Sequence, residues 1–145
     1  MAVDGLPASA SAWLLHPQLA ADTSPVCDLV LSRVLAMNTA EYPWLILVPR
    51  RAGVVEIFDL GDDARLLMTE IAMTSRALKE VTGCDKLNIA AIGNMVPQLH
   101  VHIVARRIGD PLWPKPVWGM AHPSGAAADF ASFIDSIGRA LANSG

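Results

Sequence analysis

Residues 98–105, Gln-Leu-His-Val-His-Ile-Val-Ala, restrict the possible folds of this chain more than any other segment. Successive side chains of a β-strand point to opposite faces of the sheet. One face of this segment is therefore entirely apolar, as expected for a face buried under helices. The opposite face carries three polar side chains in a row, from Gln98, His100 and His102. We predict a strand over residues 99–105, with the core on one side and a row of polar groups on the other.

Further short apolar runs predict the remaining strands of the sheet. They cover residues 26–31, 33–37, 44–48, 54–58 and 87–92. The run at 44–48 is continuously apolar and ends at Pro49, which suits a central strand. The connections at Ser32-Arg33 and at Gly53 are short, and short connections join antiparallel strands. The sequence therefore predicts an antiparallel sheet of five or six strands.

Two segments have the periodicity of helices. Residues 62–83 begin with the acidic pair Asp62-Asp63, carry an apolar stripe at helical spacing and end at Gly83. Residues 126–141 show the same spacing of large apolar side chains. The predicted fold class is α+β, with an antiparallel sheet of about five strands and helices packed on one face.

The length of 145 residues indicates a single domain. Residues 1–24 are predicted to be a short helical or irregular N-terminal lead-in. Residues 110–145 are predicted to be a Trp- and Pro-rich segment followed by the last helix. Hydrophobic residues make up 52% of the chain and charged residues only 17%, which excludes a long disordered regulator.

The charge balance and the cysteine content limit the partners and the compartment. A net charge of −3 provides no positive field for a nucleic-acid backbone or an anionic membrane, so neither is expected as a partner. The high mean hydropathy of +0.37 suggests that a second subunit covers apolar surface, and we expect a homodimer. The first residues lack the pattern of a signal peptide, so we expect no leader segment, and the two cysteines are too few for a disulfide scaffold. We therefore expect a soluble protein in the reducing cytoplasm.

The two histidines of the polar row are the main candidates for chemistry. At about 3.3 Å per residue, His100 and His102 stand roughly 6.6 Å apart along the strand, so both could touch one phosphate group. Such a pair could also hold a metal ion, but a metal site needs a third or fourth ligand. His16 and His122 are remote in sequence and lie beside prolines. We therefore expect no metal and no other cofactor, while a metal-dependent hydrolase remains an alternative to test.

The motif Gln98-x-His100-x-His102, followed by three apolar residues and Arg106, resembles the His-x-His-x-His signature of histidine triad (HIT) proteins. The resemblance covers roughly residues 26–119. It implies a HIT-like fold and a homodimer with one continuous sheet across the interface. It also implies a nucleotide as the small-molecule substrate, and hydrolase or transferase activity at a nucleoside 5′-phosphoryl bond without an obligatory metal.

Carried over by position, the resemblance implies a role for each polar residue of the motif region. His100 would be the nucleophile that forms a nucleotidyl-histidine intermediate. A main-chain carbonyl at the first motif position would hold its tautomer, and His102 would contact the scissile phosphate. Asn94 and Asn88 would bind phosphate oxygens, and Asn38 would lie near the ribose.

The chain departs from the family pattern at two positions. Gln98 replaces the first histidine, which is tolerable if that position contributes mainly its backbone carbonyl. Met95 stands where many relatives have a Ser or Thr that serves the leaving group. Trp113 and Trp118 are assigned either to closing the site, in this subunit or its partner, or to packing. The alternative to an enzyme is a non-catalytic HIT-like module that binds a nucleotide or a protein partner.

Overall fold

The computed structural model describes residues 12–120 and 125–144. Five strands form one antiparallel sheet in the order β1-β2-β3-β5-β4. The strands are β1 (Thr23–Asp28), β2 (Ser32–Met37), β3 (Trp44–Pro49), β4 (Lys86–Ala90) and β5 (Val101–Arg106). The histidine strand β5 thus lies inside the sheet, between β3 and the edge strand β4.

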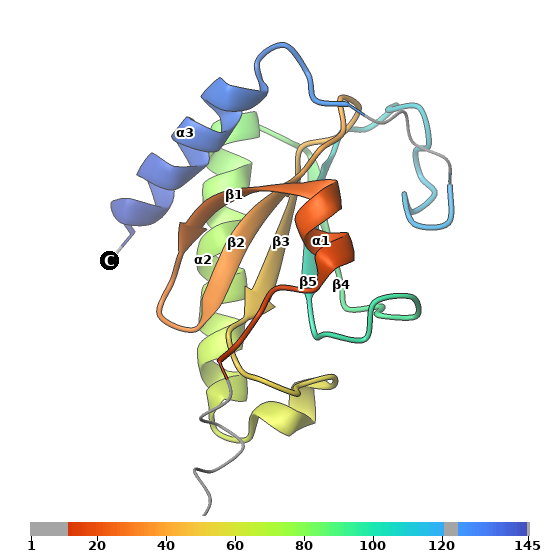
Figure 1. Ribbon diagram of the computed structural model, residues 1–145. Helices are drawn as coiled ribbons and strands as arrows, with labels where there is room; N and C mark the ends of the chain where they lie inside the picture. The colour runs from red at the N-terminus through yellow and green to blue at the C-terminus, as the bar shows by residue number, and fades with distance from the viewer. Residues whose placement is uncertain (1–11, 121–124, 145) are drawn as a thin grey trace, which may run out of the picture.

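Two long helices, α2 (Asp63–Thr82) and α3 (Phe130–Ala142), cover one face of this sheet, and the short helix α1 (Pro17–Asp22) lies on the other (Figure 1). The predicted α+β class is confirmed. No helix in the described part of the chain is long and apolar enough to cross a membrane.

The predicted alternation along the histidine strand is confirmed. Leu99, Val101 and Ile103 are at most 5% exposed and belong to the core between the sheet and the long helices. Val104 belongs to a second apolar cluster on the opposite face, together with Trp44. The polar row therefore projects away from the main core, into the face on which α1 lies.

The helix α2 follows the predicted pattern closely. Its apolar stripe, including Leu67, Ile71 and Leu78, is buried in the main core. Gly83 ends the helix in the left-handed region with φ 64°, where its N–H donates to the carbonyl of Lys79.

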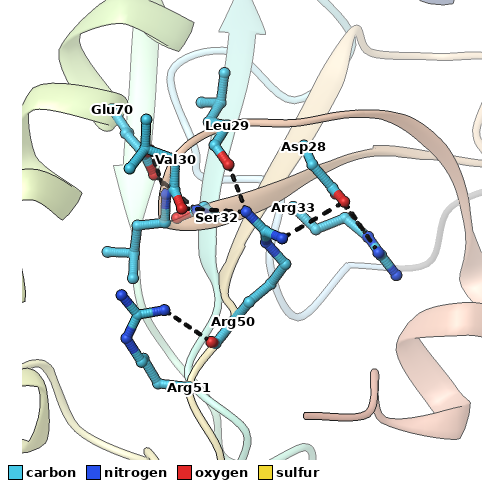
Figure 2. A network of polar contacts seen from close by, with 9 residues as sticks. Asp28, Leu29, Val30, Ser32, Arg33, Arg50, Arg51 and Glu70 are labelled. Carbon is cyan, nitrogen blue, oxygen red and sulfur yellow. Dashed lines mark hydrogen bonds and ion pairs between the residues drawn. The ribbon is translucent and has the colours of Figure 1, made fainter. Parts of the chain in front are cut away.

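The turn between β1 and β2 lies earlier in the chain than the sequence predicted. β1 ends at Asp28, and the first residue of β2 is Ser32, whereas a strand was expected over residues 26–31. The carboxylate of Glu70 on α2 accepts the backbone N–H groups of Leu31 and Ser32 at 2.8 and 2.9 Å (Figure 2). This buried acid satisfies two backbone donors at the turn, and the contact bridges 39 and 38 residues of sequence.

Arg50 closes the same turn from the other side. Its Nη2 group donates to the carbonyls of Leu29 and Val30 at 2.6 and 3.1 Å (Figure 2). Arg50 is therefore a structural residue of the turn.

The predicted strand over residues 54–58 is wrong. The segment leads instead into a short 3-10 helix, η2 (Ile57–Leu60). The carboxylate of Asp59 accepts the backbone N–H groups of Val55 and Glu56 at 3.2 and 2.9 Å. A side chain that takes backbone donors in this way competes with strand pairing. One link to the sheet end remains, in which the Val54 carbonyl accepts the N–H of Leu99.

Two irregular segments cover the histidine face of the sheet. Trp13 and Leu15 of the N-terminal lead-in pack on the second apolar cluster, as do Leu112 and Trp118 of the Pro-rich segment. Of the predicted lead-in over residues 1–24, the described part comprises the irregular residues 12–16, the short helix α1 and the first two residues of β1; residues 1–11 lie outside the described part. The last helix begins at Phe130, four residues later than predicted.

Candidate functional site

His100 and His102 lie side by side on the face opposite the main core. Their ring centroids are 4.9 Å apart and the ring planes are inclined by 68°. Each residue is only 7% exposed. Buried imidazoles need defined hydrogen-bond partners, so the partners of the four ring nitrogens determine what this pair can do.

The tautomer of His100 is set by a main-chain carbonyl. Nδ1 of His100 lies 2.7 Å from the carbonyl oxygen of Gln98. Because this oxygen can only accept, Nδ1 carries the proton and Nε2 keeps a free lone pair. The same peptide group is held at its other end, where the Leu99 N–H donates to the Val54 carbonyl at 3.0 Å. His100 therefore presents an unprotonated Nε2 from a ring whose supporting peptide group is hydrogen-bonded at both ends.

The tautomer of His102 is the opposite one. The indole Nε1–H of Trp44 donates to Nδ1 of His102 at 3.0 Å. Nδ1 is therefore an acceptor, and the proton of the neutral ring lies on Nε2. Burial, with a smaller contribution from His100, lowers the pKa of His102 from 6.5 to about 4. At neutral pH this ring is an uncharged hydrogen-bond donor.

Two tryptophans enclose the ring of His102. The rings of Trp44 and Trp118 each lie 5.7 Å from it, and 6.1 Å from each other, in edge-to-face arrangements. From the sequence, Trp44 was predicted only as part of an apolar strand and not as a partner of His102. An indole in an otherwise aliphatic strand was the available signal, since buried Trp N–H groups usually find a partner.

Gln98 contributes more than its carbonyl. The two ends of its side-chain amide bond to the backbone of the N-terminal lead-in: Oε1 accepts from the N–H of His16, and Nε2 donates to the carbonyl of Leu14, both at 2.9 Å. The structure thus brings the backbone of His16 beside the motif, although 82 residues separate it from Gln98.

Asn88 shares the histidine face, because it lies opposite Val104 in the β4–β5 pairing. Its Oδ1 accepts from Nη1 of Arg106 at 3.0 Å. The acceptor end of the Asn88 amide is therefore engaged, and only its donor end is available to a ligand.

Arg106 itself locks the Pro-rich segment to the sheet. It is 1% exposed and binds the carboxylate of Asp110 through Nε and Nη2 at 2.7 and 2.8 Å, and the carbonyl of Lys115 at 2.8 Å. The rings of Tyr42 and Trp113 lie 5.4 and 5.6 Å from its guanidinium carbon. Arg106 is thus committed to an ion pair, and Trp113 to packing on it, which fixes the segment that carries Trp118.

Asn38 is not brought beside the histidine rings. Asn38 follows β2, where its Oδ1 accepts from Ser24 Oγ at 2.8 Å. In the strand register Asn38 lies two strands and three residues away from His102, roughly 14 Å by ordinary sheet spacings. Asn94 is exposed in the turn after β4, and the neighbouring Met95 is 94% exposed.

A cavity of about 200 Å³ opens beside His100. Its wall combines apolar side chains of the segment before α2 with the turn after β4; the lining residues are Val55, Glu56, Ile57, Phe58, Ala91, Ile92, Gly93, Pro97, Leu99 and His100. Gly93 adopts φ 67° and a Cβ there would lie 3.4 Å from the Val96 carbonyl, so the turn favours glycine. The nucleophile candidate therefore borders a space that a ligand could enter.

No group of three or more His, Cys, Asp and Glu side chains that could hold a metal is found within residues 12–120 and 125–144. His16 directs its ring Nδ1 to the backbone N–H of Gln18 at 3.0 Å, and His122 lies outside the described residues. The described site offers two imidazoles and several amides as ligand-binding groups.

The chain matches the model of the HIT domain family over residues 18–109. A search among curated proteins gave no match.

Several solved structures are similar over almost the whole chain. A histidine triad protein from Bradyrhizobium japonicum is 56% identical, with a TM-score of 0.85, and the match covers 90% of this chain and 98% of that one. A histidine triad protein from Marinobacter aquaeolei VT8 is 41% identical, with a TM-score of 0.87 and coverage of 92% and 98%. A histidine triad protein from Sinorhizobium meliloti 1021 is 42% identical, with a TM-score of 0.82 and coverage of 86% and 94%.

Proposed function

The chain belongs to the HIT domain family, and from this premise we propose that it binds a nucleotide and cleaves a nucleoside 5′-phosphoryl bond through a nucleotidyl-histidine intermediate. The observation that carries the proposal is the 2.7 Å contact between His100 Nδ1 and the Gln98 carbonyl. It leaves the Nε2 lone pair of His100 ready to attack phosphorus. It also supports the view that the first motif position acts through its backbone, so that Gln98 is compatible with catalysis.

In the first step, Nε2 of His100 forms a bond to the α-phosphorus and the bond from phosphorus to the leaving group breaks. The leaving group departs with the bonding electron pair. The imidazole becomes positively charged, and its Nδ1–H bond to the Gln98 carbonyl stabilises that charge. In the second step, water attacks phosphorus, the phosphorus–nitrogen bond breaks, and the nucleoside monophosphate and a proton are released.

His102 acts in this proposal as a hydrogen-bond donor and not as an acid. Its pKa of about 4 leaves it neutral at physiological pH, with the single proton on Nε2. Donation from Nε2–H to a phosphoryl oxygen would stabilise charge that develops in the transition state. A phosphate leaving group can depart as an anion, whereas an amine leaving group would have to take its proton from water.

The amide residues would complete the nucleotide site. Asn88 lies on the histidine face with the donor end of its amide available, and the exposed Asn94 directly follows Gly93, which lines the cavity. We assign both to phosphate oxygens. Asn38 is assigned to the ribose, and its distance from the pair requires that the nucleoside extend across β3 towards β2.

A substrate panel tests this function. Diadenosine polyphosphates and adenosine 5′-phosphoramidate are incubated with the protein, and AMP release is compared with a blank without protein. Release above the blank supports the enzyme. Thermal stabilisation by the same compounds without release would support the alternative, a nucleotide-binding module.

We further propose a homodimer and a cytoplasmic location. Among the described residues, the edge strand β4 pairs with a strand on one side only. Apolar side chains are exposed on β4 and on α2, where Ile89 is 48% and Met68 is 64% exposed. Both cysteines, Cys27 and Cys84, are free thiols, as is usual in a reducing compartment. Light scattering after size exclusion measures the mass, and a monomer at micromolar concentration would contradict the dimer.

A further inference from the structure

The side chain of Gln98 pairs with the N-terminal lead-in through a planar amide. Oε1 accepts from the His16 N–H and Nε2 donates to the Leu14 carbonyl, each at 2.9 Å. One amide thus satisfies a donor and an acceptor of the same stretch of backbone, much as a neighbouring strand would. A neutral imidazole also has one donor and one acceptor, but these point away from each other across the ring, so a histidine could not make both bonds.

The lead-in at this point is itself firmly held. Trp13 and Leu15 pack on the apolar cluster of the histidine face, and the guanidinium carbon of Arg33 lies 5.1 Å from the Trp13 ring. The ring of His16 caps α1 by accepting the N–H of Gln18. Gln98 is therefore tied to a fixed part of the molecule and not to a loose end.

The backbone of Gln98 supports the nucleophile. Its carbonyl accepts the Nδ1–H of His100, and the next peptide N–H, from Leu99, bonds to the carbonyl of Val54. Residue 98 precedes the first residue of β5, Val101, by three positions, so strand pairing does not hold it. The two bonds of the side-chain amide, together with the Leu99–Val54 bond, compensate for this lack of pairing.

We propose that Gln98 is a positioning residue that couples the N-terminal lead-in to the tautomer of His100. The lead-in holds the amide, the amide holds the orientation of residue 98, and the carbonyl of residue 98 keeps the proton on Nδ1 of His100. The catalytic part of this inference rests on the proposed function, whereas the structural part concerns the protein without a ligand.

The first test replaces the amide and observes the ring directly. In Gln98→Ala the backbone carbonyl of residue 98 remains, but the side-chain bonds to His16 and Leu14 are lost. The ring ¹⁵N shifts of His100 in the ligand-free protein should change from a pure Nδ1–H form to a mixture of both tautomers. The His16 amide should exchange with solvent about fivefold faster or more, the factor of one hydrogen bond. Gln18→Ala is the control, since Gln18 bonds to Asp22 within α1 and should change neither reading.

The second test breaks the same bond from the lead-in. His16 has φ −56°, which proline adopts, so His16→Pro removes the N–H donor without forcing the backbone angle. His16→Ala removes the ring cap of α1 but keeps that N–H. The His100 ring should respond to His16→Pro as it does to Gln98→Ala, and His16→Ala should leave it close to the wild type.

The kinetic arm uses adenosine 5′-phosphoramidate and diadenosine tetraphosphate. Both Gln98→Ala and His16→Pro should lower kcat by about fivefold or more while KM stays within about twofold, because the nucleophile is affected and nucleotide contacts are not. Unchanged ¹⁵N shifts of His100 in both variants would overturn the inference. Absence of turnover in the wild type would refute the proposed enzyme, yet the ring shifts would still decide whether Gln98 positions His100.

Discussion

The indole N–H of Trp44 donates to Nδ1 of His102 across two neighbouring strands, at 3.0 Å. Trp44 lies opposite Val104 in the register, and His102 lies opposite Ile46, so the contact is a diagonal one. Aromatic side chains are long enough to reach a diagonal neighbour. The two histidines consequently have opposite tautomers, with the lone pair on Nε2 of His100 and the proton on Nε2 of His102. One ring with an acceptor Nε2 and one ring with a donor Nε2 thereby lie side by side.

Trp44→Phe should lower kcat by about tenfold, because the ring still packs but the donor that orients His102 is lost. Trp118→Phe is the matched control. Both indoles lie 5.7 Å from the His102 ring, but the buried Nε1 of Trp118 has no hydrogen-bond partner among the described residues. Steady-state kinetics should show a loss at least about threefold greater for Trp44→Phe than for Trp118→Phe. Equal losses would mean that packing, and not the hydrogen bond, matters.

The stability of the protein should depend on pH through His102. Burial lowers its pKa to about 4, against 6.5 for the ordinary side chain. Between these two values the unfolded chain binds more protons than the folded one, so the free energy of unfolding falls as the pH decreases from about 6.5 to 4. The loss of stability caused by this ring amounts to about 3 kcal/mol at pH 4, and there is no loss above pH 7.

Urea unfolding of the wild type and of His102→Gln at pH 4 to 7.5 measures this contribution. The wild type should lose about 3 kcal/mol more than the variant over this range. In the folded protein the bonds to Arg106 hold the pKa of Asp110 at about 2, below its ordinary value. Both proteins carry Asp110, so its contribution to the pH dependence cancels in the comparison. Parallel curves for the two proteins would show that His102 titrates normally.

Asp110→Asn should destabilise the protein by about 3 kcal/mol, because it leaves the buried Arg106 without its charged partner. The side chains of Arg106 and Asp110 are 1% and 9% exposed. Asp28→Asn is the control, since the Arg33–Asp28 pair is 35% and 40% exposed and should be worth less than about 1 kcal/mol. Chemical denaturation followed by tryptophan fluorescence compares the two. A decrease of less than about 1 kcal/mol in the unfolding free energy of Asp110→Asn would contradict the view that the Arg106–Asp110 ion pair holds the Pro-rich segment on the sheet.

Metal removal should leave turnover unchanged. The described residues hold no cluster of three metal-ligating side chains around the imidazole pair. Dialysis against a chelator followed by the AMP-release assay measures the effect. A loss that zinc restores would favour a metal-dependent hydrolase instead.

The parts of the fold that follow a local repeat could be predicted from the sequence. Alternation placed Leu99 and Val101 in the main core and His100 and His102 on the other face. A period of 3.6 residues predicted α2, and Gly83 ends it as expected. These features depend on neighbours within a few residues, which the sequence displays directly.

Contacts between distant segments account for what the sequence could not predict. Glu70 binds backbone N–H groups of the β1–β2 turn although it lies 38 residues further along the chain. Asp59 binds the backbone N–H of Glu56 in a segment whose apolar residues suggested a strand. In the site, Gln98 was recognised for its carbonyl, but its bonds to the lead-in depend on how the chain returns across the sheet. The indole of Trp44 reaches His102 only through the β3–β5 register.

The most direct test of the account is to trap the covalent intermediate. The wild type and His100→Ala are mixed with adenosine 5′-phosphoramidate or diadenosine tetraphosphate, quenched within one turnover and analysed by mass spectrometry. We predict an adenylate adduct on His100 in the wild type. His100→Ala should bind AMP normally, form no adduct and lose at least about 10³-fold in turnover. An adduct on another residue, or undiminished turnover in His100→Ala, would contradict the proposed mechanism.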